Sequence, residues 1–309
     1  MITPQRGLRQ GCPLSLYLFI ICAEAFSNLL IQAERKKQTQ GLRFGQQISI
    51  SHLLFADDSL IFSQALTKDC QHLKIIFKCY ATTSGQIFNY NKSCMFFSGN
   101  APAKQFSYIK RIFQLNVMSR HEKYLGLPSM IGRKKKTFFN EIKLKIQSKI
   151  FNWQQKLFSS GGKEVLIKAV AQAIPAYAMS VFKIFVGLCD DIKRNIAGFW
   201  WSKKKENRGI PWTRWEEMSR AKIKGGMRFR DISSFNQALV AKQGWRIIQN
   251  LESLAARVLK TRYFPMTDCL RAFIGLNPSY IWRSIMWGEC CANFIELAST
   301  RIYYRIDQW

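Results

Sequence analysis

Two adjacent acidic residues, Asp57 and Asp58, are the strongest candidates for chemistry in this sequence. Apolar runs at residues 50–55 and 60–62 flank them, which predicts a β-hairpin whose tip carries both carboxylates. Carboxylates on a rigid, solvent-accessible turn are suitable ligands for a hard divalent cation. The pair also suits a tight turn without any metal, because Asp tolerates turn geometry, so the spacing alone leaves both interpretations open.

Helices and further strands must position this hairpin. Gly11 and Pro13 precede an apolar pattern of helical period, so a helix is predicted from Pro13 to about Arg35. Apolar residues within 73–80 predict an amphipathic helix that stops at Gly85. Residues 94–97 and 124–128 are predicted to form short strands.

The pattern becomes helical after Arg133. Apolar side chains recur at helical spacing from Phe138 to Trp153 with lysines beside them, and a second helix is predicted after Gly162, with a break at Pro175. Most of the tryptophans follow. We interpret them as core residues rather than as platforms on which bases stack.

Charge and composition narrow the class of protein. The 309 residues contain 47 Lys and Arg against 19 Asp and Glu, a formal charge of +28, which points to a polyanionic partner, either nucleic acid or an anionic membrane face. With 48% apolar residues the chain is expected to fold. Nine cysteines without a C-x-x-C spacing, and only three histidines, argue against a zinc site and favour a reducing compartment.

The apolar stretches bear on membrane association. No transmembrane helix is expected, since the uncharged apolar stretch at residues 169–182 is too short to span a bilayer and contains Pro175. Arg6 and Arg9, followed by apolar residues 14–23, imitate a signal peptide. A secreted or membrane-associated protein with a cleaved leader is therefore one alternative interpretation.

Four segments occur in a fixed order along the chain: residues 9–15 (RQGCPLS), 55–58 (FADD), 84–93 (SGQIFNYNKS) and 124–128 (YLGLP). This succession resembles the reverse transcriptase of non-LTR retrotransposons, the LINE class and its plant branch in particular. The likeness continues through residues 160–168, 173–177, 199–201, 224–226 and 238–246, so it covers essentially the whole chain.

The resemblance implies RNA-directed DNA synthesis with Mg²⁺ as the cofactor. Asp57 would be the catalytic, metal-binding aspartate, and Asp58 its catalytic neighbour. Gln10 and Gly11 would lie beside the incoming nucleotide and the template, and Lys92 would lie near the triphosphate.

Further contacts with nucleic acid are implied by the same resemblance. Tyr124, Leu125 and Gly126 would belong to the primer-grip strand. The residues that would contact the nucleic-acid backbone from a lysine-rich thumb helix are Arg133, Lys134, Lys135, Lys136 and Lys143. The implied partners are RNA, DNA and their hybrid, with no membrane and no small-molecule cofactor apart from the dNTP substrates. The sequence leaves the cellular location open; an intracellular one is expected, and the nucleus is compatible with it.

The implied fold class is α+β, with three parts. Residues 1–132 would form a partial polymerase palm of a β-hairpin plus helices, residues 133–185 a helical thumb, and residues 186–309 a helical, tryptophan-rich C-terminal region.

One expected element has no counterpart in the sequence. In the resembled family a strand with its own aspartate precedes the Gln-Gly segment, and two-metal chemistry draws its carboxylates from both strands. The acids before Asp57 are Glu24 and Glu34, both in the first predicted helix. We therefore expect a chain that begins within the palm and is inactive on its own. A non-catalytic protein that binds nucleic acid through a basic helical surface is the alternative.

Overall fold

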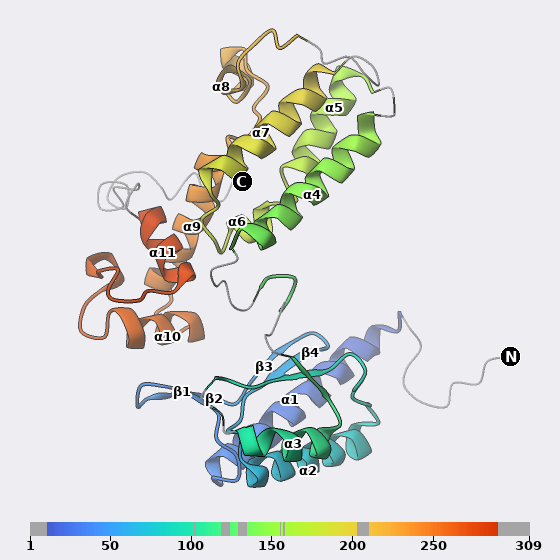
Figure 1. Ribbon diagram of the computed structural model, residues 1–309, viewed down its shortest axis with the longest axis vertical. Helices are drawn as coiled ribbons and strands as arrows, with labels where there is room; N and C mark the ends of the chain where they lie inside the picture. The colour runs from blue at the N-terminus through green and yellow to red at the C-terminus, as the bar shows by residue number, and fades with distance from the viewer. Residues whose placement is uncertain are drawn as a thin grey trace, which may run out of the picture. The chain divides into compact units, whose positions relative to one another are not determined.

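The computed structural model describes residues 11–99, 101, 103–118, 124–128, 135–154, 156, 158–202 and 210–289. The chain divides into two compact units, Met1–Glu122 (unit 1) and Lys123–Trp309 (unit 2), which are drawn in Figure 1. Helices make up most of the regular structure and the strands form small two-stranded sheets, so the predicted α+β class is confirmed. The predicted boundary at residue 132 lies outside the described residues, and the palm and thumb assignments stay predictions.

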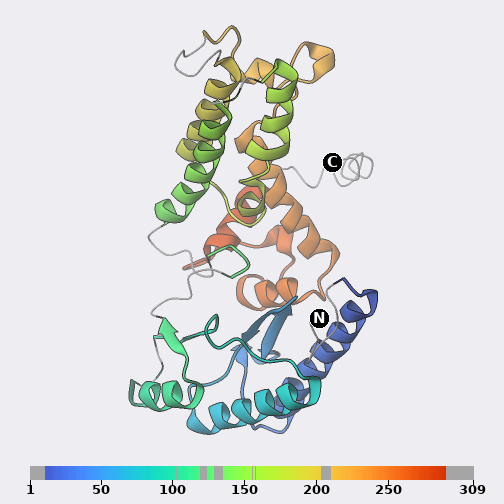
Figure 2. The same cartoon turned by 90° about the vertical axis from the view of Figure 1, so that its right-hand side faces the viewer.

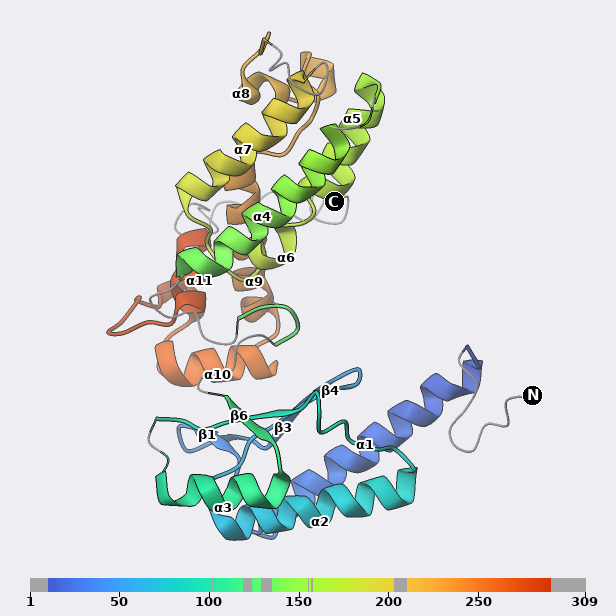
Figure 3. The ribbon, with the colours of Figure 1, turned by 45° about the vertical axis from the view of Figure 1, so that its right-hand side comes forward.

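Three helices build the framework of unit 1. α1 (Pro13–Arg35) begins at the predicted proline, and α2 (Thr67–Ser84) ends at Gly85, whose φ of 71° gives the left-handed cap conformation. α3 (Ala103–Phe113) packs beside α2, as Figure 3 shows. The buried core of this unit consists of Phe26, Leu30, Cys70, Leu73, Tyr80, Ile109 and Phe113.

The first half of α1 is unusually apolar for an exposed helix. Leu16, Tyr17 and Ile21 are each more than 60% exposed. Among the described residues α1 is the one helix long and apolar enough to cross a membrane, with a mean hydropathy of 1.9. The expectation that the chain has no candidate transmembrane helix therefore overlooks α1. Its second half nevertheless belongs to the core of unit 1, where Phe26 and Leu30 are buried.

The strands of unit 1 pair two by two. β1 (Leu42–Phe44) is antiparallel to β2 (Ile48–Ile50), and β3 (His52–Phe55) is antiparallel to β4 (Asp58–Ile61), which confirms the predicted hairpin. β5 (Cys94–Phe96) was predicted and runs parallel to β6 (Asn116–Met118). Within the described residues no third strand joins β3 and β4, so this pair has unpaired edges.

The strand predicted at residues 124–128 is wrong. Tyr124 and Leu127 form a single antiparallel bridge, with hydrogen bonds of 2.7 and 3.0 Å between their backbone groups. Leu125 and Gly126 lie between them with φ angles of 51° and 77°. Positive φ at two consecutive residues produces a tight reverse turn, which an apolar pattern does not reveal.

Unit 2 begins with a helical bundle, seen in Figure 2. α4 (Lys135–Gln154) packs along α7 (Val186–Trp201), and α5 (Ser160–Leu166) also contacts α7. A π-helical turn (Ile167–Ala171) continues α5, and α6 (Ala176–Met179) starts after Pro175, where the break is predicted. The isoleucines of the predicted stripe are buried, whereas its two ends, Phe138 and Trp153, are half-buried against the core. The buried residues of this core include Phe139, Ile142, Ile146, Ile150, Ile192, Ile196 and Phe199.

The rest of unit 2 is helical as well. Its elements are α8 (Trp215–Met218), α9 (Ile232–Gln249), α10 (Leu254–Tyr263) and α11 (Tyr280–Glu289), with 3₁₀ turns at Lys222–Lys224 and Cys269–Arg271. α9 packs against α11 over a second core in which Trp282 is fully buried. The core role predicted for the tryptophans is confirmed for Trp282, whereas Trp212 is 74% exposed.

Candidate functional site

The tip of the β3–β4 hairpin presents two carboxylates to solvent. Phe55 pairs with Asp58 across the strands, so Ala56 and Asp57 form a two-residue turn, with Ala56 at a φ of 48°. Asp58 is the first residue of β4, and both aspartates are exposed. Neither side chain forms a hydrogen bond or an ion pair with another described residue. Both carboxylates are therefore available for a ligand.

His52 fastens the base of this hairpin to α1. Its Nε2 is hydrogen-bonded with the hydroxyl of Ser27 on α1 at 2.8 Å, and its Nδ1 with the hydroxyl of Ser51 at 3.0 Å. Burial lowers the pKa of the imidazole, and the charges of Glu34 and Glu24 oppose that shift. Sequence reasoning missed this residue, although strand alternation puts it on the same face as Leu54, which packs on the core of unit 1.

The remaining described acids of unit 1 are engaged elsewhere. Glu34 accepts hydrogen bonds from the backbone N–H of Gly41 and from a serine hydroxyl. Asp69 is buried and accepts from the backbone N–H of Gln40 at 3.0 Å. Glu24 accepts from a neighbouring asparagine one helical turn along α1. These three carboxylates accept hydrogen bonds from other groups of unit 1. Among the described residues, none of them is a further acidic partner for the hairpin tip.

The hairpin tip meets only part of the requirement for a metal site. No group of three or more His, Cys, Asp or Glu residues in the described part of the chain is placed to hold a metal ion. Mg²⁺ prefers six oxygen ligands, and a two-metal site needs carboxylates that bridge both ions. Asp57 and Asp58 therefore fit one side of such a site and do not complete it.

The predicted nucleotide-binding residues lie at exposed positions. Gly11 has a φ of 86°, which favours glycine, and a Cβ placed there would meet no atom within 4 Å, so the space beside it is open. Lys92 is exposed in a turn held by its own backbone N–H, which donates to Asn89. No hydrogen bond or ion pair joins either residue to the two aspartates within the described chain. Gln10 lies outside the described residues.

The predicted primer-grip residues belong to unit 2. Tyr124, Leu125 and Gly126 form the reverse turn described above, and the adjoining Leu127 packs on the core formed by α4 and α7. Their role at a primer stays a prediction.

The residues predicted to contact the nucleic-acid backbone differ in whether other residues of the protein already bind them. Lys143 donates to Asp191 on α7 at 2.6 Å, which lowers the pKa of that carboxyl, and Nζ of Lys135 lies 4.1 Å from the ring centre of Tyr280. Both cations thus contribute to the packing of unit 2. Lys136 is exposed and forms no ion pair with a described residue. Arg133 and Lys134 lie outside the part of the chain that the structure describes.

Two further lysines of α4 face solvent. Lys145 and Lys149 are one helical turn apart, at the edge of the stripe that buries Ile142, Ile146 and Ile150. They form no ion pair with any described residue. Unit 2 contains 33 Lys and Arg against 13 Asp and Glu, which is a formal charge of +20. Most of the +28 of the whole chain is therefore on this unit.

Comparison with known proteins adds an independent finding. Residues 2–129 match the family described as reverse transcriptase (RNA-dependent DNA polymerase), and this segment contains the hairpin tip. An uncharacterized mitochondrial protein of Arabidopsis thaliana is 43% identical over 118 residues, which are 38% of this chain and 77% of that protein. Another uncharacterized mitochondrial protein of the same plant is 38% identical over 103 residues, which are 33% of this chain and 84% of that protein.

A third relative, also from Arabidopsis thaliana, is provisionally named a ribonuclease H protein. It is 30% identical over 166 residues, which are 52% of this chain. Those residues span only 26% of the length of that relative.

Proposed function

The chain belongs to the reverse transcriptase (RNA-dependent DNA polymerase) family, and from that premise we propose that it binds RNA–DNA hybrids and that the 309-residue polypeptide alone does not extend a primer. We further propose an origin in a plant-type non-LTR retrotransposon. The order of the sequence segments and the plant relatives support this origin.

The isolation of the two aspartates is the observation that carries the proposal that this chain alone does not extend a primer. Asp57 and Asp58 occupy one exposed turn, and the other described acids of unit 1 are engaged in the scaffold. Mg²⁺, when bound, would act as a Lewis acid on a phosphate. The two carboxylates could hold such an ion, but they supply only one side of the ligand set. Catalysis then requires a further acidic strand supplied by another polypeptide or by additional sequence.

The cationic surface of unit 2 supports the proposal that the chain binds RNA–DNA hybrids. A polyanion is the partner that an excess of positive charge on unit 2 favours, and free lysines on α4 are suited to phosphate contacts. Lys136, Lys145 and Lys149 are more suitable for this role than Lys143, because Lys143 is already paired with Asp191. Phosphate contacts give affinity without sequence specificity, so the proposal concerns the shape and charge of the duplex.

Primer extension tests the catalytic part. The purified chain is incubated with an RNA template, a DNA primer, dNTPs and Mg²⁺, beside the Asp57→Ala variant. We expect no extension above the level of that variant. Robust extension that depends on Asp57 would refute the proposal.

Binding of a fluorescent RNA–DNA hybrid tests the other part. Affinity should decrease steeply with salt, and the Lys145→Gln/Lys149→Gln double variant should lower the slope of log K against log salt by about two, because about 0.9 counterion is released per phosphate contact. Asp57→Ala should bind normally. The control is Lys68→Gln/Lys78→Gln, which removes two exposed charges from α2 of unit 1. Equal effects of both double variants would show that α4 is not the interface.

A further inference from the structure

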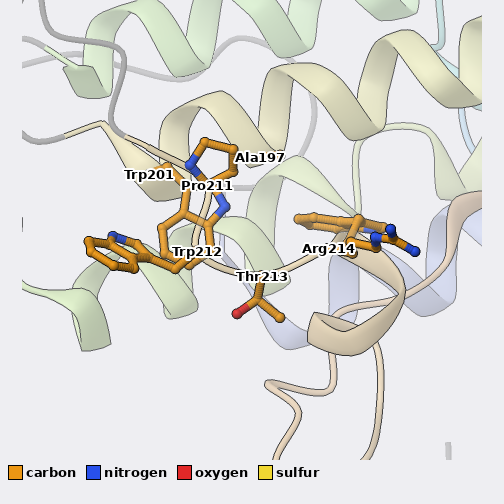
Figure 4. A pocket seen from close by; sticks show the side chains of 7 residues that line it. Ala197, Trp201, Pro211, Trp212, Thr213 and Arg214 are labelled. Carbon is orange, nitrogen blue, oxygen red and sulfur yellow. The ribbon is translucent and has the colours of Figure 1, made fainter.

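A shallow pocket of about 310 Å³ lies at the C-terminal end of α7 in unit 2, and Figure 4 shows it from close by. Ala197 and Trp201 of α7 form one wall, and the segment that leads into α8, from Pro211 to Trp215, forms the other. The lining is mainly apolar and includes three tryptophans, and Thr213 and Arg214 contribute polar side chains.

Trp212 is the anomaly of this pocket. Its side chain is 74% exposed and makes no ring contact with a described residue. The neighbouring Trp215 behaves differently, because its ring stacks on Phe229 at 5.3 Å with an angle of 6° between the planes. An indole is the largest apolar side chain, and an isolated one in water lacks the burial that stabilises Trp282. An exposed indole beside an aromatic pocket therefore indicates a binding surface.

Two polar groups of the pocket have no protein partner among the described residues. Arg214 is exposed, and its guanidinium forms no ion pair with the described residues. The Nε1–H of Trp215 is buried and finds no hydrogen-bond acceptor among them. A guanidinium suits a phosphate, and an indole N–H requires an acceptor oxygen or nitrogen.

The unit that contains the pocket is cationic, with 33 Lys and Arg against 13 Asp and Glu. Of the acids on α8, Glu217 is paired with Arg220, which leaves Glu216 as the opposing charge. The charge therefore favours an anionic ligand.

We propose that this pocket binds an unpaired base of single-stranded RNA or DNA, with the indole of Trp212 stacked on the base and Arg214 on an adjacent phosphate. Aromatic platforms combined with cations are the usual means of binding single strands without sequence preference, since every base has a flat face. A base inside a duplex is stacked on both sides and cannot enter. The proposal shares nucleic acid with the proposed function but uses residues other than the hairpin tip and α4.

The experiment uses the full chain and fluorescent 12-mers of oligo(dT) and oligo(U) at constant salt. Trp212→Ala should weaken binding of at least one oligomer by about 5-fold to 150-fold, the range expected for losing one base stack. Trp212→Phe should retain most of the affinity. Arg214→Gln should lower the salt slope by about 0.7, as expected for one phosphate on a single strand.

Phe273→Ala is the matched control, because that ring is also exposed, at 86%, but lies away from the pocket lining. It should leave binding of the oligomers unchanged. An unchanged thermal midpoint of Trp212→Ala shows that the fold is intact, as expected for a side chain without packing contacts.

Three outcomes overturn the proposal. Normal binding by Trp212→Ala would reassign the indole to a protein partner, and equal binding of an abasic oligomer of the same length would exclude stacking. An equal loss of RNA–DNA hybrid binding would mean that Trp212 contacts duplexes as well. A loss confined to single strands in Trp212→Ala, with a loss confined to hybrids in the α4 double variant, would separate this site from the one in the proposed function.

Discussion

Asn236 on α9 offers the sharpest test of the architecture of unit 2. Its side chain is 1% exposed and satisfies three backbone groups of the segment between α6 and α7. Its Oδ1 accepts from the N–H of Ile184 at 2.8 Å, and its Nδ2 donates to the carbonyls of Met179 at 2.8 Å and Phe182 at 2.9 Å. This one amide thus fastens a buried connection to α9.

The magnitude follows from these three bonds. Each is worth about 0.5–1.5 kcal/mol net, and a buried backbone group that is left without a partner costs about 1–3 kcal/mol. Asn236→Ala removes all three partners at once, and water entering the vacated space recovers part of the loss. We expect the free energy of unfolding of unit 2 to decrease by about 3–5 kcal/mol. For a unit of this size, at about 2–4 °C per kcal/mol, that corresponds to a midpoint roughly 6–20 °C lower.

Tryptophan fluorescence is the suitable assay, because all nine tryptophans lie in unit 2. Urea or thermal unfolding followed at the indole therefore reports this unit alone. Asn140→Ala, at an exposed position on α4, is the matched control and should change the stability by less than about 0.5 kcal/mol. A loss for Asn236→Ala as small as that of the control would refute the role assigned to the buried amide.

Three other predictions concern local features. Because burial lowers the pKa of His52, the folded state favours the neutral imidazole. Hydrogen-exchange protection of β3 and β4 should therefore be full above the ordinary histidine pKa of 6.5 and decrease as the pH falls from there through the lowered pKa of the folded state, and His52→Gln should abolish this dependence. Gly288→Ala should destabilise unit 2 by about 1–3 kcal/mol in urea unfolding, since a Cβ there would lie 2.8 Å from a backbone nitrogen of α9, whereas Gly198→Ala meets open space and should be neutral or stabilising. Burial raises the pKa of Cys70 to about 11, so peptide mapping after brief iodoacetamide treatment should find exposed Cys79 alkylated and Cys70 protected, and equal labelling would contradict the burial.

The sequence pattern correctly predicted those elements whose start, end or turn is specified by neighbouring residues. The hairpin around Asp57, the start of α1 at Pro13 and the end of α2 at Gly85 follow from residues adjacent in sequence. The turn at Tyr124 was missed because Leu125 adopts a positive φ, a backbone conformation that a leucine in the sequence does not predict. Asn236 was also missed, since a polar residue in a helical pattern gives no sign of buried partners 52 and 57 residues away.

Residue types and short-range spacing are enough to identify the family, the basic character and the position of the two aspartates on a turn. The three-dimensional fold, in contrast, establishes which charged groups remain without a protein partner. It pairs Lys143 with Asp191 and directs Glu34 to the scaffold, yet leaves Lys145, Arg214 and the indole of Trp212 exposed. The reason is physical: a charge or a ring is available to a ligand only if no neighbour brought close by folding satisfies it first, and those neighbours come from distant parts of the chain.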